Sequence, residues 1–353
     1  MAVGWPAGAL ASVLDCLSAL PGPDRPVGMG GWLRRALHML VLALRDNVPP
    51  RDYILHRLHE PGRQAWAADG LYGREPQWLS ARLARLAGAR WQDVQDKARF
   101  ADLCRRHGLP CIPTLAIYRG GARVLPDVPF VPDQTGLWVK DLTGNRGMGA
   151  VCWRCDGGLY RDERRDMSVA PEALEALWRQ RDCLVQPLLV AHPVLAALSM
   201  GAAIADFRVV SGIDPAGHVS IIAAQARLGA GGREPRWYIL AAVEEGGRLR
   251  NPLLGGYLPL SHHPDTGADL TAVTVPFWSE VLELVMRAHG EVPEFARFPF
   301  LGWDVAITHE GPVLIETNAG WDGTYPQAGA LPLGRTALPS IALAHLEKEQ
   351  ACG

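Results

Sequence analysis

Two apolar runs near the C-terminus, FLGWDVAIT and PVLIETN, constrain the fold most, because each alternates like a strand and only the short polar stretch HEG separates them. This pattern predicts a β-hairpin over 300–318. If 309–311 is a three-residue loop, counting back along the strands places Asp304 directly opposite Glu316 on the same face. Asn318 is then the diagonal neighbour of Asp304.

Two facing carboxylates are destabilising unless something compensates their charge. Magnesium suits the carboxylates of Asp304 and Glu316 and the amide of Asn318, since it takes oxygen ligands, keeps some waters and is usually completed by substrate phosphates. The alternative is a solvated acidic pair at a strand end, with Asn318 as a turn former. The apolar neighbours Trp303, Val305 and Ile315 favour the metal interpretation.

A lysine and a glycine-rich turn form a second motif. Lys140 ends the expected strand 137–141, and the turn that follows contains Gly144, Asn145, Arg146, Gly147 and Gly149. Glycines let backbone N–H groups approach a phosphate, and lysine adds a point charge. The order differs from that of a P-loop, in which lysine follows the glycines. The motif fits a hairpin that folds over phosphates, and a plain hairpin remains the alternative.

Three polar side chains interrupt apolar strands. Arg208 and Arg227 each sit within such a run, and buried arginine is rare unless it is paired. Either each forms a salt bridge with a carboxylate or reaches solvent, or both enter a cleft and contact a γ-phosphate or a developing acyl phosphate. Gln186, in CLVQPLL, is either a core amide or a group near a nucleotide base.

The rest of the chain predicts an α+β fold with mostly antiparallel sheets. Residues 1–93 are rich in Ala, Leu and Arg with helical spacing, and we expect a helical region for packing or partner binding. One stripe in it comprises Trp32, Leu33, Ala36, Leu37, Leu40, Val41 and Leu44. Helices and strands then alternate, and we expect linkers at the Pro-rich segment 119–136 and at the polar, glycine-rich segments 229–235 and 244–271.

Composition excludes several classes of protein. The 353 residues are 48% hydrophobic and 20% charged, which is typical of a globular chain. The net charge of −2 offers no basic surface for nucleic acid, and no apolar run is long enough to cross a membrane. The seven cysteines are scattered, including a lone CxxC that reads as packed thiols, so we expect a reducing cytoplasm.

With these residues in place, the chain resembles the ATP-grasp superfamily, and most closely its sugar-transfer associated branch. The matching stretches are DKARFADLCRRHGLPCIP, VKDLTGNRGMGA, LVQPLLVAHPVLAAL, DFRVVS, HPDTG and GWDVAITHEGPVLIETNAGWDG. The resemblance implies an ATP-grasp fold, with two α+β subdomains at 94–190 and 191–353 that grip ATP, after a helical extension at 1–93.

The resemblance also implies a ligand set of ATP and Mg²⁺. Lys97, Lys140 and the turn 144–149 would contact the phosphates, and the hinge residues Gln186, Pro187 and Leu188 would hold the adenine. Asp304, Glu316 and Asn318 would carry one or two magnesium ions, and Arg208 and Arg227 are the candidate catalytic residues. The sequence after Arg227 lacks the Asp-Asn signature common in related members.

The implied activity joins a carboxylate to an amine or thiol, both small molecules, through an acyl phosphate with release of ADP and phosphate. A small-molecule kinase and a non-catalytic nucleotide-binding protein are the alternatives. Candidate contacts to the acceptor substrate are Trp321, Asp322, Arg146, His263 and the segment 244–271, each of which also has a structural interpretation.

Overall fold

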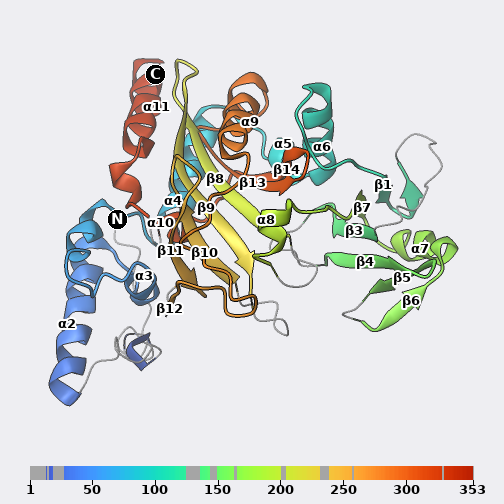
Figure 1. Ribbon diagram of the computed structural model, residues 1–353. Helices are drawn as coiled ribbons and strands as arrows, with labels where there is room; N and C mark the ends of the chain where they lie inside the picture. Colours follow the sequence, from blue (N-terminus) through green and yellow to red (C-terminus); the bar gives the residue numbers. More distant parts are fainter. Residues whose placement is uncertain are drawn as a thin grey trace.

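A computed structural model describes residues 13, 16–18, 28–124, 136–143, 149–162, 165–199, 204–230, 238–256, 258–327 and 330–352. Within them lie two antiparallel sheets of seven strands each (Figure 1). The small sheet has the order β2 (Ala122–Arg123), β1 (Ala116–Arg119), β7 (Cys183–Pro187), β3 (Gly136–Asp141), β4 (Val151–Asp156), β5 (Leu159–Asp162) and β6 (Met167–Val169). The large sheet has the order β12 (Leu258–Pro259), β11 (Leu249–Leu254), β10 (Tyr238–Val243), β9 (Val219–Gly229), β8 (Asp206–Ile213), β13 (Phe300–Thr308) and β14 (Gly311–Asn318).

Some helices pack against the sheets, and others form the N-terminal region of the chain. They are α2 (Gly28–Asp46), α3 (Pro50–Leu55), η2 (Gln64–Asp69), α4 (Glu75–Leu86), α5 (Gln92–Gln95), α6 (Lys97–Arg106), α7 (Pro171–Trp178), α8 (Pro193–Ala196), α9 (Trp278–Glu291), α10 (Thr324–Gln327), η3 (Leu333–Arg335) and α11 (Leu338–Cys352). None of the described helices is long and apolar enough to cross a bilayer. The expected α+β class with a helical N-terminal region is confirmed.

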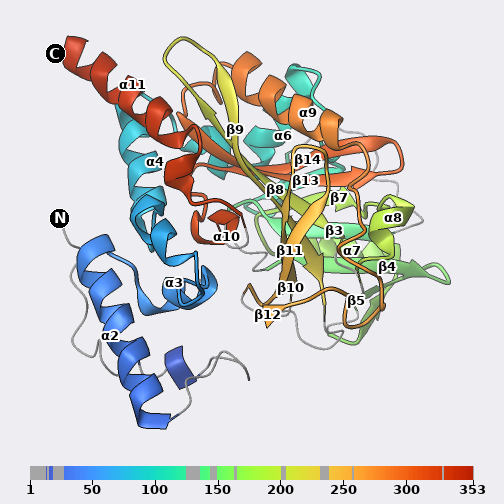
Figure 2. The same cartoon turned by 60° about the vertical axis from the view of Figure 1, so that its left-hand side comes forward.

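Strand β13 is buried along its whole length, because both faces of the large sheet are covered there. Trp303 packs with Phe295 and the core beside α9. Phe300, on the opposite face, packs with Trp321 and with Ile341 of α11. Figure 2 shows α4 and α11 together over this second face. Further along β13, the face that carries Phe300 also carries Asp304. The contacts on this face therefore change from apolar at Phe300 to ionic at Asp304.

The prediction that 244–271 is a linker is wrong, because this segment contains strand β11, which pairs with β10. Leu249 and Leu253 of this strand are buried, yet burial does not alternate between them, because Asn251 is exposed and Pro252 is buried. Asn251 has a positive φ of 47°, and the β10–β11 register shifts between Leu240 and Ala242. These irregularities break the two-residue period by which a strand is recognised in sequence.

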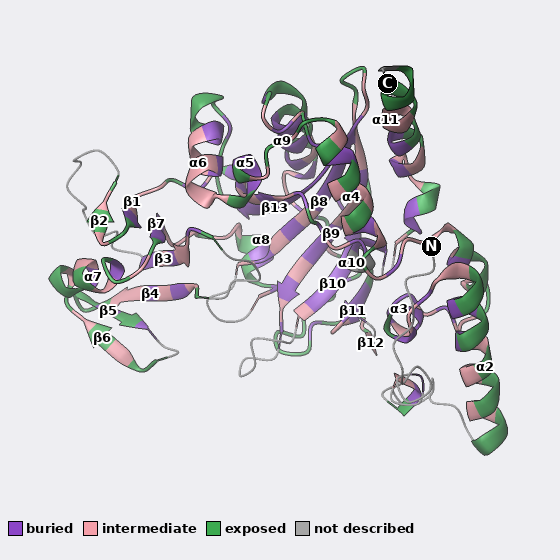
Figure 3. Ribbon diagram, turned by 180° about the vertical axis from the view of Figure 1, so that it is seen from behind, coloured by how far each residue is buried: buried purple, intermediate pink, exposed green. Residues whose placement is uncertain are grey.

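The N-terminal helices fall into two groups. Helix α4, within the expected unit 1–93, packs with the apolar face that Phe300 and Ile341 share. Residues before it form their own small core around Met39, Leu42 and Tyr53. Most residues of the predicted apolar stripe on α2, such as Leu33 and Leu37, face outward. The residues that this helix buries are Met39, Leu42 and Ala43. Figure 3 shows the exposed colour along α2.

Candidate functional site

The hairpin of β13 and β14 pairs Asp304 with Glu316, as predicted, but by a different route. The loop has two residues rather than three, since Thr308 pairs with Gly311. A regular ladder from that loop would place Ile315 opposite Asp304. The register shifts between Asp304 and Val305, and this one-residue bulge restores the pairing with Glu316. The bulge therefore brings both carboxylates to the same face.

Asp304 is buried and engaged by two arginines. Arg208 Nε donates to Asp304 Oδ1 at 2.5 Å, and Arg208 Nη2 donates to Asp304 Oδ2 at 3.0 Å. Arg227 Nη2 lies 2.9 Å from Asp304 Oδ1. Burial by itself would raise the pKa of Asp304, but the two guanidinium groups lower the pKa to about 2. The carboxylate is therefore ionised at neutral pH.

A second aspartate completes this ionic cluster. Asp206 lies opposite Arg227 on the neighbouring strand and accepts a hydrogen bond from its Nε. Burial raises the pKa of Asp206, while Arg227 opposes that shift. Desolvation of Arg227 is outweighed by Asp206 and Asp304, so its pKa is raised. The strands β13, β8 and β9 thus bring Asp304, Asp206 and both predicted arginines into one network.

Lys140 approaches this network from the small sheet. It pairs with Leu184 across β3 and β7. Burial lowers the pKa of its ammonium, and Glu316 is the carboxylate that most opposes the shift. Lys97 adds a like charge that lowers the pKa further, and both lysines line the same cavity. Cationic groups therefore slightly outnumber the carboxylates Asp206, Asp304 and Glu316, and the combined site favours an anion.

A narrow cavity joins the two sheets at this point. Its lining includes Lys97, Lys140, Gln186 and Ile315. The cavity measures about 10 Å³, close to the space that one water needs. The cavity lies where Lys97, Lys140 and Gln186 approach Ile315 of β14.

Gln186 has an orphaned polar atom beside this cavity. Its Nε2 donates to the carbonyl of Ile112 at 3.4 Å. Its Oε1 is buried without a hydrogen-bond partner among the described atoms. A buried acceptor of this kind is costly unless a ligand donates to it, and an exocyclic amine such as that of adenine has the required chemistry. The next residues are engaged in the sheet, because Pro187 pairs with Leu137 and the N–H of Leu188 donates to Gly136.

The glycine-rich turn lies mostly outside the described residues, which include none of Gly144, Asn145, Arg146 and Gly147. Gly149 is described and has φ of +75°. A Cβ at this position would lie 2.0 Å from Asp141 Oδ2. Asp141 pairs with Arg181, whose guanidinium also donates to the carbonyl of Gly149. Only glycine therefore fits here against the carboxylate.

Two residues that shape the ionic cluster, Gly302 and Asp206, were not among those predicted from the sequence. A Cβ at Gly302 would lie 2.7 Å from Trp321 Cβ and 3.4 Å from Arg208 Cδ. The missing side chain leaves room for Arg208, while Asp206 holds Arg227. The signal in the sequence was the two-residue spacing in DFR, which puts Asp206 and Arg208 on one face of a strand.

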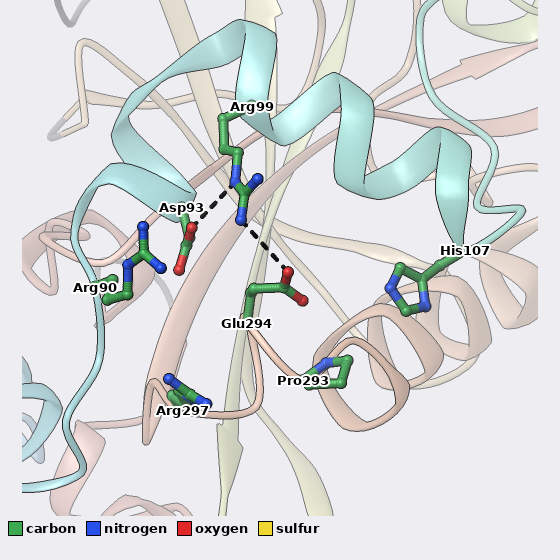
Figure 4. Close-up of a pocket in the computed structure, with 7 residues that line it drawn as sticks. All are labelled: Arg90, Asp93, Arg99, His107, Pro293, Glu294 and Arg297. Atoms are coloured by element: carbon green, nitrogen blue, oxygen red, sulfur yellow. Dashed lines mark hydrogen bonds and ion pairs between the residues drawn. The ribbon is translucent and has the colours of Figure 1, made fainter.

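Lys97 is positioned by the start of helix α6. Asp96 caps this helix, and its Oδ1 accepts from the N–H groups of Ala98 and Arg99 at 2.9 and 3.1 Å. Arg99 lies in a separate hollow of about 390 Å³. There its guanidinium contacts Asp93 at 3.2 Å and Glu294 at 3.5 Å (Figure 4). These ion pairs anchor the helix that presents Lys97 to the cavity between the sheets.

Two of the candidate acceptor contacts have structural partners. Trp321 is buried, and its Nε1 donates to Ser80 Oγ at 3.1 Å. His263 is buried, with Nε2 2.9 Å from the carbonyl of Gly229 and Nδ1 accepting from the N–H of Asp265 at 3.2 Å. Arg146 lies outside the described residues. The ionic cluster and the narrow cavity are therefore where most of the described candidate residues meet.

The donor set fits a hard cation. Within the described part of the chain, no three His, Cys, Asp or Glu side chains are arranged to hold a metal by themselves. Asp304 and Glu316 supply two carboxylates, and Asn318 Nδ2 lies 3.4 Å from Glu316 Oε1. Magnesium needs no complete protein cage, because waters and phosphate oxygens fill its remaining positions. A magnesium ion that arrives with a polyphosphate matches these residues.

Several solved structures resemble this one at low identity. N5-carboxyaminoimidazole ribonucleotide synthetase in complex with ADP has a TM-score of 0.44 and 10% identity, over 71% of this chain and 52% of that one. L-amino acid ligase from Bacillus licheniformis has a TM-score of 0.40 and 12% identity, over 80% and 55%. The ATP-grasp ligase PsnB has a TM-score of 0.37 and 16% identity, over 90% and 72%. The chain thus spans about half the length of the first two proteins.

No curated protein matches the sequence. The sequence model of the sugar-transfer associated ATP-grasp proteins matches residues 87–333, a stretch that contains the narrow cavity, the ionic cluster and the β13–β14 hairpin. The chain therefore belongs to the sugar-transfer associated ATP-grasp family.

Proposed function

We propose that this protein is an ATP- and Mg²⁺-dependent ligase that joins a small carboxylate to an amine or thiol. The observation that carries the proposal is the pair Asp304 and Glu316, held between two arginines of the large sheet and Lys140 of the small sheet. A carboxylate oxygen of the substrate attacks the γ-phosphorus, ADP leaves, and the nucleophile then displaces phosphate from the acyl phosphate.

Charge neutralisation is the main task of the protein in such a reaction. Lys97 and Lys140 would hold phosphate oxygens, and Arg208 and Arg227 would exchange part of their pairing with Asp304 for the transferred phosphoryl group. Asp304, Glu316 and Asn318 would hold magnesium, which would neutralise part of the phosphate charge. The turn 144–149 would cover the phosphates from the small sheet.

The adenine would lie against the strand β7. Gln186 Oε1, buried without a described partner, would accept a hydrogen bond from the exocyclic amine. Pro187 and Leu188 would form the wall of this pocket rather than its donors, because the Leu188 N–H is bonded to Gly136. The scattered cysteines favour the cytoplasm as the location, and the substrates would be small molecules.

The test is a screen of carboxylates crossed with amines and thiols, with ADP release and mass spectrometry of the products. Glu316→Gln is the critical variant, because it removes the negative charge of one proposed magnesium ligand without unpairing Arg208 or Arg227. Glu310→Gln is its matched control, since that side chain lies in the loop of the same hairpin and is 84% exposed.

Glu316→Gln should reduce turnover by about 100-fold or more, and Glu310→Gln should leave it unchanged. Equal activity of the two variants contradicts the assignment of the site. Formation of a stable phosphorylated product without free phosphate would instead identify a kinase.

A further inference from the structure

Helix α2 carries the largest group of exposed apolar side chains on any one described element. The side chains of Met29, Leu33, Leu37, Leu40, Val41 and Leu44 are between 44% and 84% exposed. The helix buries Met39, Leu42 and Ala43 on its other side. It is therefore apolar on two faces, of which one is covered by its own small core. An apolar patch of this size on a protein surface marks an interaction site.

The spacing of the leucines indicates that the partner is another helix. Leu33, Leu37, Leu40 and Leu44 follow each other at intervals of four, three and four residues, which is the spacing of a coiled-coil seam. The series is symmetric about the midpoint between 38 and 39. In an antiparallel pair, Leu33 therefore meets Leu44 of a second copy, and Leu37 meets Leu40. A surface that complements itself in this way suits a two-fold dimer.

The symmetric spacing of the leucines fits an antiparallel register in which residue 33 of one helix lies beside residue 44 of the other. In this register the two exposed Arg34 side chains lie about 13 Å apart along the axis, at 1.5 Å per residue.

The area is adequate for a dimer of moderate affinity. Each large aliphatic side chain contributes on the order of 100 Å² when it is buried. Six such side chains on each of the two copies would together bury at most about 1,200 Å², the lower end for specific interfaces. Figures 1 and 2 show α2 on the far side of the large sheet from the small sheet, so this pairing leaves the cavity between the sheets accessible.

We propose that two copies of this protein associate through α2 as an antiparallel helix pair with Leu33, Leu37, Leu40 and Leu44 at its centre. The partner is a second copy of the same chain, and the contact is apolar. The proposal does not depend on the enzymatic function, because none of these residues lies in the ionic cluster or lines the narrow cavity.

Sedimentation velocity of the full chain, from about 2 to 200 μM, tests the pairing. The wild-type chain should pass from monomer to dimer in this range, and Leu37→Glu should weaken the association at least tenfold. Leu343→Glu is the matched control, because Leu343 is also 58% exposed but lies on α11. It should dimerise like the wild type, and binding of Mg–ATP should be equal in all three proteins.

A charge pair tests the orientation. Leu33→Glu and Leu44→Lys should each weaken the dimer, whereas the double variant should recover it, because antiparallel helices place residue 33 beside residue 44 of the other copy. A wild-type chain that stays monomeric at about 200 μM overturns the proposal. Dimerisation that survives Leu37→Glu, or a double variant weaker than both single ones, overturns it as well.

Discussion

The two halves of the candidate site differ in how completely their polar groups are satisfied. In the large-sheet half, Asp206, Asp304, Arg208 and Arg227 bond to each other. In the small-sheet half, Lys140 is half-buried and desolvation lowers its pKa, and Gln186 Oε1 has no described partner. A satisfied network is rigid and preformed, whereas unsatisfied buried groups are stabilised only when a ligand arrives. Opposite effects on stability should therefore follow from substitutions in the two halves.

The largest effect is expected for Asp304→Ala. The change leaves Arg208 and Arg227 with less compensation in a buried position, so the free energy of unfolding should fall by about 3–5 kcal/mol. ADP formation should fall at least about 100-fold. Chemical denaturation and an ADP-release assay measure the two quantities, with Glu310→Ala as the control. A stable and active Asp304→Ala variant would show that the network is not central to the site.

Acid should weaken the large sheet selectively. His289 is fully buried behind β13, with Ser211 Oγ at 2.7 Å and the carbonyl of Phe298 at 2.8 Å, and burial lowers its pKa to about 4. The unfolded histidine takes up a proton near its ordinary pKa of 6.5, so the unfolded state binds more protons between these values. The free energy of unfolding should therefore fall as the pH drops through 6.5, by about 3 kcal/mol at pH 4.

Hydrogen exchange at pH 7 and pH 4.5 can locate this effect. The segment 108–191, which contains the small sheet, has no histidine in its sequence. After correction for the slower intrinsic exchange at low pH, we expect lower protection factors in β8 and β13 at pH 4.5 before any change in β3 and β7. A His289→Gln variant should show a shallower dependence of stability on pH. Uniform acid sensitivity across both sheets would argue against this comparison.

Gly302→Ala should act through Arg208. The new methyl group would press against Trp321 and the arginine side chain, and overpacking of this kind costs about 1–3 kcal/mol. Displacing Arg208 should also slow turnover. Thermal unfolding and ADP release are the measurements. Gly320→Ala, with no described atom within 4 Å of its new methyl, should be close to neutral.

The smallest change in stability, and of the opposite sign, is expected for Lys140→Met. Removing a buried ammonium should leave the free energy of unfolding unchanged or raise it by up to about 1 kcal/mol. The affinity for Mg–ATP should fall at least about tenfold, because a charged donor to the phosphates is lost. Calorimetric titration and denaturation report the two effects. A variant that is less stable yet binds normally would place Lys140 in the structural network instead.

The sequence alone predicted the face of the site better than its details. Alternation was sufficient for the hairpin, since Asp304 and Glu316 had to share a face if their strands paired. The two-residue loop and the compensating bulge at Ile315 were not predictable, because a bulge depends on how a strand twists against its neighbours. Strand β11 was missed for the same reason, as Asn251 interrupts its alternation.

The arginines show a second limit of sequence patterns. Each was open to a salt-bridge or a cleft interpretation, and the structure gives both a carboxylate partner within the candidate site itself. Choosing between pairing and phosphate contact needs the ligand, because the same guanidinium group can serve both. For α2, helical spacing identified the apolar stripe, but only packing reveals that Leu33 and Leu37 face outward while Met39 faces the core.

The ion pairs between Asp304 and its two arginines affect which anions can bind at the candidate site. A tethered carboxylate acts as an internal competitor, present at high effective concentration whatever the solution contains. Free phosphate arriving without a cation would have to displace it and leave a buried carboxylate with less counter-charge. A polyphosphate that carries its own divalent ion would give the displaced aspartate a new counter-charge, so we expect the resting protein to discriminate against bare inorganic anions.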